Sequence, residues 1–245
     1  MTRYRLELEY DGTPFVGWQR QDNGPSVQQV LEEAGEALSG DKASSVAAGR
    51  TDAGVHARRM TVHIDLSGEF TPDTVRDALN FHMKPAPVSI TDASLAPKGF
   101  HARFSASDRA YEYLLVDRRA PLALDMNRAW RIPTKLDVEG MHKAAQALVG
   151  KHDFTTFRAS KCQSNSPVKT LSEITVERLP KHVRVFVRAP SFLHHQVRSI
   201  VGSLVEVGTG HWAGDDLAAA LAQKDRTRCG QVAPACGLYF LWAEY

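Results

Sequence analysis

One carboxylate of the chain stands in a setting that suits chemistry. Asp52 lies within residues 49–57, which read GRTDAGVHA, with Gly49 and Gly54 on either side of it. Glycine permits positive φ angles and the close approach of another backbone, so this loop can present one acid with little bulk around it. The ordinary interpretation is a tight turn in which the aspartate caps its own backbone. These nine residues alone leave both interpretations open.

An arginine and a tyrosine elsewhere in the chain lie at positions that suit either a binding site or plain packing. Arg198 falls within a predicted helix, at about 140° from Leu193 on a helical wheel, at the edge of the apolar stripe. An arginine there can bury its stem and direct its guanidinium into a cleft, although it can equally snorkel over the core at the surface. Tyr111 lies on a predicted strand, where a plain packing role is the alternative.

The elements around Asp52 alternate between strands and helices. The apolar periodicities and turn signals predict these elements in the first half of the chain. They are a strand at residues 4–10, a helix capped by Ser26 with Gln29 in a capping-box pattern, strands near Val46 and at residues 59–66, a helix opened by Thr71 and Pro72, and a strand at residues 88–95.

The second half repeats this mixture. It predicts a strand at residues 111–116, a helix capped by Asp137, two strands at residues 171–179 and 183–187 joined by a turn at residues 180–181, and a helix from about His194 to Val207. Neighbouring strands resemble hairpins, which favours an α+β fold. We expect two α/β subdomains, residues 1–106 and 107–245, with a mixed, largely antiparallel sheet, helices on one side, and the catalytic cleft between the subdomains.

The composition is that of an average globular protein. The chain has 245 residues, a formal net charge of +2 and three cysteines, none of them spaced C-x-x-C. An odd cysteine count without such spacing supports neither a disulfide framework nor a zinc ribbon. The start of the sequence has no apolar signal segment, and no apolar run is long enough for a membrane span. We therefore expect a cytoplasmic protein without a membrane partner.

Six segments together resemble the tRNA pseudouridine synthase A family. They occur in the order of that family and span nearly the whole chain, which is far more specific than any one of them. They are YDGTPFVGWQRQ at residues 10–21, GRTDAGVHA at 49–57, FHARFSA at 100–106, RAYEY at 109–113, SFLHHQVR at 191–198 and APACGL at 233–238. Gln196 and Cys236 depart from the residues that are common at those positions, and neither is assigned to the chemistry.

The resemblance implies an isomerase that converts uridine to pseudouridine in tRNA, at positions 38, 39 and 40 of the anticodon stem and loop. The bond from sugar to ring nitrogen is broken, the uracil turns, and a bond to carbon-5 is made, so no cofactor is needed. The resemblance makes Asp52 the catalytic carboxylate. It can attack the anomeric carbon or ring carbon-6, or assist elimination at the sugar, and the sequence does not choose among these routes.

The same resemblance assigns roles to residues around the acid. Arg198 becomes the partner that keeps Asp52 ionised, because burial raises the pKa of a carboxyl and an adjacent arginine lowers it by ~1–3 units. Tyr111 becomes the residue that stacks on the target uracil and that can remove the proton from carbon-5. Substrate contacts are assigned to Arg50, Leu238, His56, Arg58 and Arg103. Trp18 is expected to support the Asp52 loop.

A basic and aromatic stretch near the midpoint is predicted to contact RNA, since flipping a uridine out of its stack costs a few kcal/mol. These side chains can supply phosphate contacts and stacking surface: Lys98, Phe100, His101, Arg103, Phe104 and Arg109. Further candidates are Lys151, His152, Arg158, Lys161 and Lys169. His194 and His195 suggest a metal, but adjacent helical residues point about 100° apart and chelate poorly, so we predict none.

Two other classes of function remain to be weighed. An RNA-binding module without catalysis explains the basic stretch but not Asp52 together with Arg50, Tyr111 and Arg198 in matching segments. A metal-dependent nuclease or phosphatase needs two or more clustered carboxylates, and the motifs offer only Asp52. The resemblance also implies a homodimer with one tRNA across both protomers, which accounts for the modest net charge.

Overall fold

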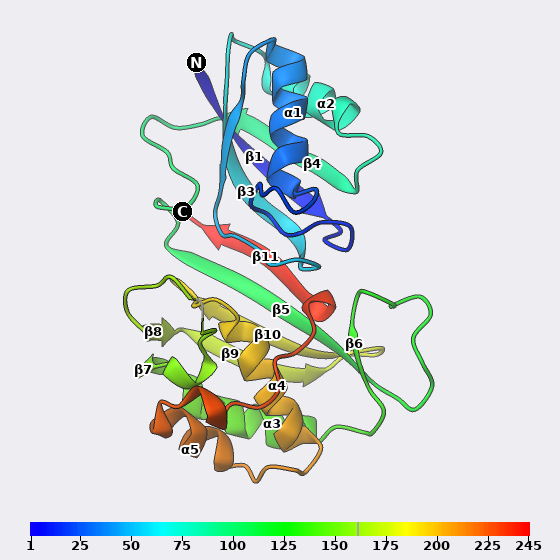
Figure 1. Cartoon of the computed structure of the whole chain (residues 1–245), viewed down its shortest axis with the longest axis vertical. Helices are drawn as coiled ribbons and strands as arrows, with labels where there is room; N and C mark the ends of the chain where they lie inside the picture. The colour runs from blue at the N-terminus through cyan, green and yellow to red at the C-terminus, as the bar shows by residue number, and fades with distance from the viewer. Residues whose placement is uncertain (161) are drawn as a thin grey trace. The chain divides into compact units, whose positions relative to one another are not determined.

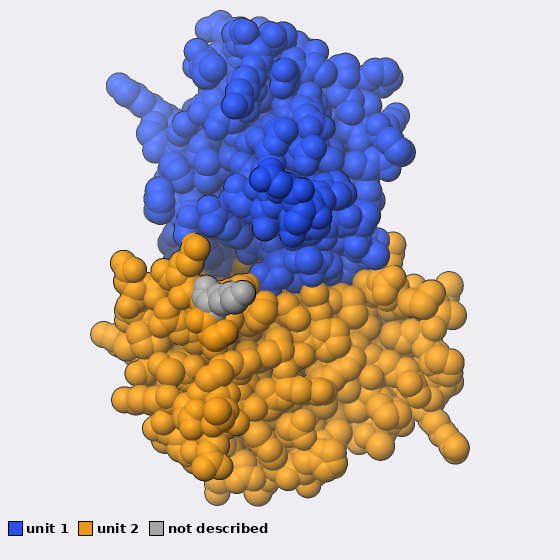
Figure 2. Space-filling model, viewed as in Figure 1, with its two compact units in different colours: residues 1–109, 239–245 blue, residues 110–238 orange. Residues whose placement is uncertain are grey.

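The computed structural model describes residues 1–160 and 162–245, so the predicted RNA contact at Lys161 lies outside the described residues. The chain divides into two compact units, which Figure 2 colours separately: unit 1 comprises residues 1–109 and 239–245, and unit 2 comprises residues 110–238. The division differs from the expected subdomains 1–106 and 107–245 at the C-terminus. Tyr239 and Phe240 of β11 (Leu238–Glu244) pair in parallel with β3 (His56–Leu66), which attaches the last strand to unit 1.

Unit 1 is built on a mixed sheet with the strand order β4–β1–β3–β11. The remaining strands are β1 (Thr2–Tyr10), β2 (Ser44–Ala47) and β4 (Val88–Leu95). β1 is antiparallel to both β3 and β4. Two strands pair with the other edge of β3. β2 is antiparallel to the C-terminal half of β3, and β11 is parallel to its first residues.

Two helices cover one face of this sheet (Figure 1). They are α1 (Val27–Ser39) and α2 (Pro72–His82), which pack on each other. Both caps are as predicted, since Ser26 accepts the N–H of Gln29 and Thr71 accepts that of Thr74. The side-chain N–H2 of Gln29 donates to Glu33 at 2.9 Å, one turn further along the helix.

Unit 2 has a second group of strands in the order β5–β10–β9. They are β5 (Asp108–Asp117), β9 (Glu173–Arg178) and β10 (Val183–Ala189), with β6 (Trp130–Ile132) parallel to the end of β5. β9 and β10 form the predicted antiparallel hairpin. A separate antiparallel pair joins β7 (Gly150–Asp153) to β8 (Val168–Leu171).

Three helices belong to unit 2: α3 (Val138–Ala145), α4 (Gln196–Gly208) and α5 (Asp216–Gln223). They pack on one another, and α3 also packs on β9 (Figure 1). Nearly every residue of α4 is buried, including Ile200, Val201 and Leu204 at helical spacing. Short 3₁₀ turns lie at Gln146–Leu148, Thr155–Phe157, Arg226–Arg228 and Ala235–Gly237.

The expected α+β class is confirmed, with antiparallel pairs and a few parallel ones. The sequence did not predict α5, β11 and the short strands β6 to β8, whose patterns are brief or nearly uniform in hydropathy. No helix in residues 1–160 and 162–245 has the length and apolar character that crossing a membrane requires.

Candidate active site

The Asp52 loop (residues 49–57) is held in unit 1 by main-chain bonds to the N-terminal segment. The N–H of Trp18 donates to the carbonyl of Thr51 at 3.0 Å, and Gly17 and Asp52 form an isolated antiparallel bridge. Within the loop, the N–H of Val55 donates to the carbonyl of Asp52 at 3.1 Å. Backbone on two sides therefore fixes the direction of the half-buried Asp52 side chain.

Two glycines of the N-terminal segment allow this close approach. A Cβ on Gly17, which has φ +119°, would lie 2.7 Å from the carbonyl oxygen of Thr51. A Cβ on Gly12 would lie 2.0 Å from the carbonyl oxygen of Val55. Both distances are shorter than atoms tolerate, so any side chain here displaces the loop. The YDGTPFVGWQ segment is thus the support on which the loop rests.

Buried side chains complete that support. The hydroxyls of Tyr10 and Thr51 lie 2.8 Å apart, and the side chain of Trp18 is 2% exposed with its ring near that of Tyr10. This position fits the structural role expected for Trp18.

His56 and Arg58, both predicted to contact substrate, have different surroundings. His56 is 2% exposed; its Nδ1 accepts the N–H of Gly12 at 3.0 Å, and its ring stacks on Tyr239 with centroids 4.7 Å apart. The exposed Arg58 lies over the same tyrosine ring at 4.7 Å. His56 therefore ties the N-terminal segment to β3, and substrate contact by its ring stays a prediction.

A shift in the pairing register of β1 and β3 explains why Arg58 is exposed although His56, two residues earlier on the same strand, is buried. Leu8 pairs with Met60 and Tyr10 with Ala57, so β3 has one extra residue in this stretch. Arg58 and Arg59 fall in the shift and both are exposed, whereas simple alternation would bury one of them. Arg50 is exposed as well, so the predicted RNA-contacting arginines of this region lie at the surface.

In unit 2, three separated segments of the sequence meet around residues 233–238. Arg198 of α4 donates from Nε to the carbonyl of Ala233 at 2.8 Å, and the Ala233 N–H donates to the Arg198 carbonyl at 3.1 Å. Tyr113 of β5 donates its hydroxyl to the carbonyl of Pro234 at 2.7 Å. Gly237 packs so closely on Tyr113 that a Cβ there would lie 2.5 Å from the ring. Segment 233–238 thus joins α4 to β5.

The two tyrosines of β5, Tyr111 and Tyr113, have different surroundings. Tyr113 is fully buried, and burial raises the pKa of its hydroxyl far above the ordinary value, with Cys236 adding to the rise and Arg198 opposing it. Tyr111 is 9% exposed and meets Phe192 edge to face, with centroids 5.1 Å apart. Phe192 is a neighbour that the sequence reasoning missed, although it lies inside the SFLHHQVR segment.

Besides Tyr111, the resemblance assigned roles to Arg198 and Leu238 of unit 2. Arg198 is half-buried in the first turn of α4, which fits a stem packed at the edge of the apolar stripe. Leu238 is 6% exposed at the start of β11, directly after the Ala235–Gly237 turn. Its contact with a substrate base stays a prediction, because a buried leucine also suits plain packing.

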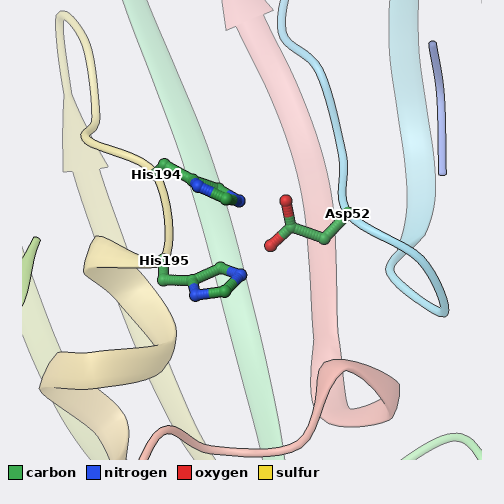
Figure 3. A group of neighbouring side chains, drawn as sticks. All are labelled: Asp52, His194 and His195. Atoms are coloured by element: carbon green, nitrogen blue, oxygen red, sulfur yellow. The ribbon is translucent and has the colours of Figure 1, made fainter. Parts of the chain in front are cut away.

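The paired histidines are not helical, which corrects the argument made from their spacing. α4 begins at Gln196, and His195 is its N-cap residue in the left-handed conformation, with φ +62°. The rings of His194 and His195 lie with centroids 4.0 Å apart, so a 100° separation does not describe them. Figure 3 shows this turn before α4, and also the loop that carries Asp52. The absence of a bound metal stays a prediction.

The sequence as a whole matches known proteins. A profile of the tRNA pseudouridine synthase family matches residues 8–105 and 144–245. Curated relatives named tRNA pseudouridine synthase A are each 56% identical over all of this chain: from Maricaulis maris over 98% of that relative, from Paramagnetospirillum magneticum over 96%, and from Rhodospirillum centenum over 100%.

Among solved structures, a chain in the crystal structure of a Cbf5–Nop10–Gar1 complex aligns with 97% of this chain and 49% of its own length. Its sequence identity is 10% and its TM-score is 0.38, so the likeness is too weak to support an argument. The sequence matches need no such support, because the family profile covers most of the chain and the relatives match it from end to end. The chain belongs to the tRNA pseudouridine synthase family.

Proposed function

We propose that this protein isomerises uridine to pseudouridine in tRNA, at positions 38, 39 and 40 of the anticodon stem and loop. Enzymes of its family carry out this isomerisation. The observation that carries the proposal is the support of the Asp52 loop: Gly12 and Gly17 let the N-terminal segment approach it closely, and a main-chain bridge joins Gly17 to Asp52. A reaction that needs one nucleophile and no redox step suits such an arrangement.

Asp52 is the proposed catalytic carboxylate. It attacks the anomeric carbon or ring carbon-6 of the flipped uridine, or assists elimination. Each route breaks the bond between the anomeric carbon and N1, lets the uracil turn, and forms the bond from carbon-5 to the sugar, after which the bond or contact to Asp52 is released. A bridge through the backbone of Asp52 limits how far the carboxylate can move. Such positioning supplies much of the catalytic effect in reactions of this kind.

Unit 2 supplies the proposed partners. Tyr111 stacks on the uracil and takes the proton from carbon-5, and its ring is held by the edge contact with Phe192. Arg198 directs its guanidinium to the carboxylate, and its bond from Nε to the Ala233 carbonyl limits the rotamers that it can adopt. We propose that both units act on one nucleotide, with Leu238 against the base and Arg50, His56, Arg58 and Arg103 toward the RNA.

The assembly and the location are proposed on the same resemblance. The protein works as a homodimer in the cytoplasm, with one tRNA in contact with both protomers. Its formal net charge of +2 is small for a protein that binds a polyanion. Two protomers joined around one tRNA provide a larger basic surface than a single chain does.

The decisive experiment follows tritium release from unmodified tRNA labelled at uracil carbon-5, without added metal or cofactor. Wild type should release tritium, and Asp52→Asn should be slower by on the order of 10³-fold or more while still binding the tRNA. Asp92→Asn removes an exposed carboxylate of the same unit and serves as the control.

Three outcomes separate the candidate functions. Full activity of Asp52→Asn would remove the aspartate from the mechanism. Tight tRNA binding without release from any tRNA would favour an RNA-binding module. Loss of wild-type activity on addition of EDTA would favour metal-dependent chemistry.

A further inference from the structure

The structure sorts the basic and aromatic stretch of unit 1 into buried and exposed members. Phe100 is 7% exposed and packs against Tyr245, so its ring faces the core. Arg109 donates to the carbonyls of Ala48, Ala106 and Arg103 and thereby braces the chain. Phe104, in contrast, is 77% exposed. A single exposed apolar side chain is ordinary at a protein surface, so any role of Phe104 depends on how its neighbours hold it.

Phe104 is held by a histidine beneath it. The two rings of His101 and Phe104 are stacked, with centroids 4.4 Å apart and planes 29° apart. Nδ1 of His101 accepts the N–H groups of Arg103 and Phe104, both at 3.2 Å. The N–H of His101 donates to the hydroxyl of Ser105 at 3.0 Å. The turn that carries Phe104 is therefore tied to the ring on which Phe104 rests.

A second histidine supports the first. His63 of β3 is 3% exposed, and its ring meets that of His101 at 68° with centroids 4.8 Å apart. Its Nδ1 accepts the N–H of Ala102 at 3.0 Å. Burial, followed by the charges of Arg3 and His101, lowers the pKa of His63 to about 4, so this ring is neutral near pH 7. The Phe104 platform (His63, His101, Arg103 and Phe104) is thus anchored in the sheet.

The platform also carries positive charge at its edge. The guanidinium of Arg103 lies 5.7 Å from the centre of the Phe104 ring, and both side chains are exposed. Lys98, in the turn before Phe100, is exposed as well. An aromatic face beside a cation is the combination that binds an unpaired nucleotide, because the base stacks on the ring while the cation meets the phosphate.

We propose that the Phe104 platform binds an unpaired nucleobase of the tRNA substrate, in addition to the uridine that reacts. The base stacks on the outer face of Phe104, and Arg103 contacts a neighbouring phosphate. The proposal rests on the proposed function, since the anticodon loop supplies the unpaired bases. It assigns Phe104 and His101 to substrate binding rather than to catalysis.

The test compares two RNAs of equal length: an anticodon stem–loop with its unpaired loop, and a fully paired duplex. Phe104→Ala should bind the stem–loop roughly 5- to 100-fold more weakly than wild type, because stacking on an aromatic ring carries that much affinity per base. Its affinity for the duplex should not change. Phe104→Trp should restore stem–loop binding, and its added fluorescence should be quenched by the RNA.

Phe81→Ala is the matched control. Phe81 is 68% exposed in the same unit and meets the ring of His82 edge to face, at 5.3 Å. It lies in α2 without a basic residue shown over its ring, and its loss should leave binding of both RNAs unchanged. Thermal melting of each variant shows that folding is intact.

Salt dependence separates the two roles within the platform. Arg103→Gln should reduce the slope of log affinity against log salt by about 1, because one phosphate contact is lost. Phe104→Ala should leave that slope unchanged while lowering affinity at every salt concentration. A smaller slope for Phe104→Ala would mean that the ring acts by positioning the Arg103 guanidinium rather than by stacking on a base.

Several results would overturn the proposal. Unchanged stem–loop binding by Phe104→Ala, or an equal loss on the duplex, would remove the stacking role. A change from dimer to monomer in sedimentation would assign Phe104 to contact with a second copy of the chain. If wild type isomerises tRNA and Phe104→Ala binds the stem–loop normally, the platform proposal fails and the proposed function stands. Wild type that binds the stem–loop without isomerising any uridine would defeat the proposed function alone, and wild type that binds no RNA would defeat both.

Discussion

The two regions that carry the proposed chemistry are built in different ways. The Asp52 loop is held by main-chain contacts, with the bridge to Gly17 and the N–H of Trp18 as its supports. The group around segment 233–238 is held by side chains, since Arg198 and Tyr113 each donate to one of its carbonyls. The first region therefore depends above all on the absence of side chains at Gly12 and Gly17. The second depends above all on two side-chain donors, although Gly237 also packs closely on Tyr113.

This difference predicts different failures. A substitution that adds a Cβ beside the Asp52 loop displaces the backbone, because the carbonyl of Thr51 has no rotamer into which it can move. A substitution in the second region removes one donor and leaves the backbone able to adjust. In the first region, activity should be lost because the backbone that carries Asp52 is displaced. In the second, it should be lost because a side-chain donor is removed.

After Asp52 itself, the largest effect is expected at Arg198. Arg198→Met keeps the stem and removes the guanidinium, and should lower turnover roughly 10²–10³-fold, as loss of one charge-stabilising donor does. In the Asp52→Asn background the same change should cost little more, because residues that act on one step are not additive. Single-turnover rates of the four proteins give the comparison. Independent, multiplied losses would show that the two residues act on different steps. Arg119→Met, at an exposed arginine of unit 2, is the control.

The two tyrosines of β5 should fail in opposite ways. Tyr111→Phe keeps the ring but removes the hydroxyl, and should lower turnover by on the order of 10²-fold with unfolding unchanged, if the hydroxyl takes part in proton transfer. Tyr113→Phe leaves the Pro234 carbonyl without its donor and should cost about 1 kcal/mol of stability with near-normal turnover. Urea denaturation and tritium release measure the two quantities. Normal turnover of Tyr111→Phe would leave Tyr111 a stacking role only.

A pair of glycines tests the main-chain half of the comparison. Gly17→Ala should lower activity roughly 10- to 100-fold, because a displacement of about 1 Å at a reacting group has that effect. Gly40→Ala is the control: Gly40 also has a positive φ, +74°, but open space where its Cβ would lie. It should lose some stability and no activity. Equal activity of the two variants would show that the loop accommodates the added methyl group.

The smallest effect concerns acid stability in unit 1. The pKa of His63 is lowered to about 4, so the folded state resists a proton that the unfolded chain accepts near pH 6.5. Its contribution to stability is complete above pH 6.5 and is lost as the pH falls toward 4. His63→Asn keeps an acceptor for the Ala102 N–H without titrating. Wild type should therefore lose roughly 1 kcal/mol more than this variant between pH 7.5 and 5, about 2–4 °C in melting temperature.

Identical acid dependence of the two proteins would show that other groups set it. Asp117 is not one of them in this pH range. Burial raises its pKa, but the bonds from Arg178 and the Leu136 N–H more than offset this and lower it to about 2. Its contribution would be lost only at a lower pH than that of His63.

Local signals in the sequence predicted most elements where those signals are strong. Ser26, Thr71 and Asp137 cap helices as expected, because each cap needs only a side-chain oxygen and an N–H two or three residues away. The prediction that α4 includes His194 was wrong, since the apolar spacing continues into a turn in which His195 takes a positive φ. Periodicity alone does not reveal where a backbone leaves the helical conformation.

The sequence by itself determined the family, the single carboxylate between two glycines, and the residues expected around it, because the motifs are local strings that can be compared directly. Only the tertiary structure decided what each motif rests against. Gly12 and Gly17 matter through Val55 and Thr51, and Arg198 and Tyr113 meet at residues 233–238. It also decided that His56 is buried while Phe104 is exposed. Such outcomes depend on contacts between distant segments, and no pattern within one segment encodes the backbone that another will bring close.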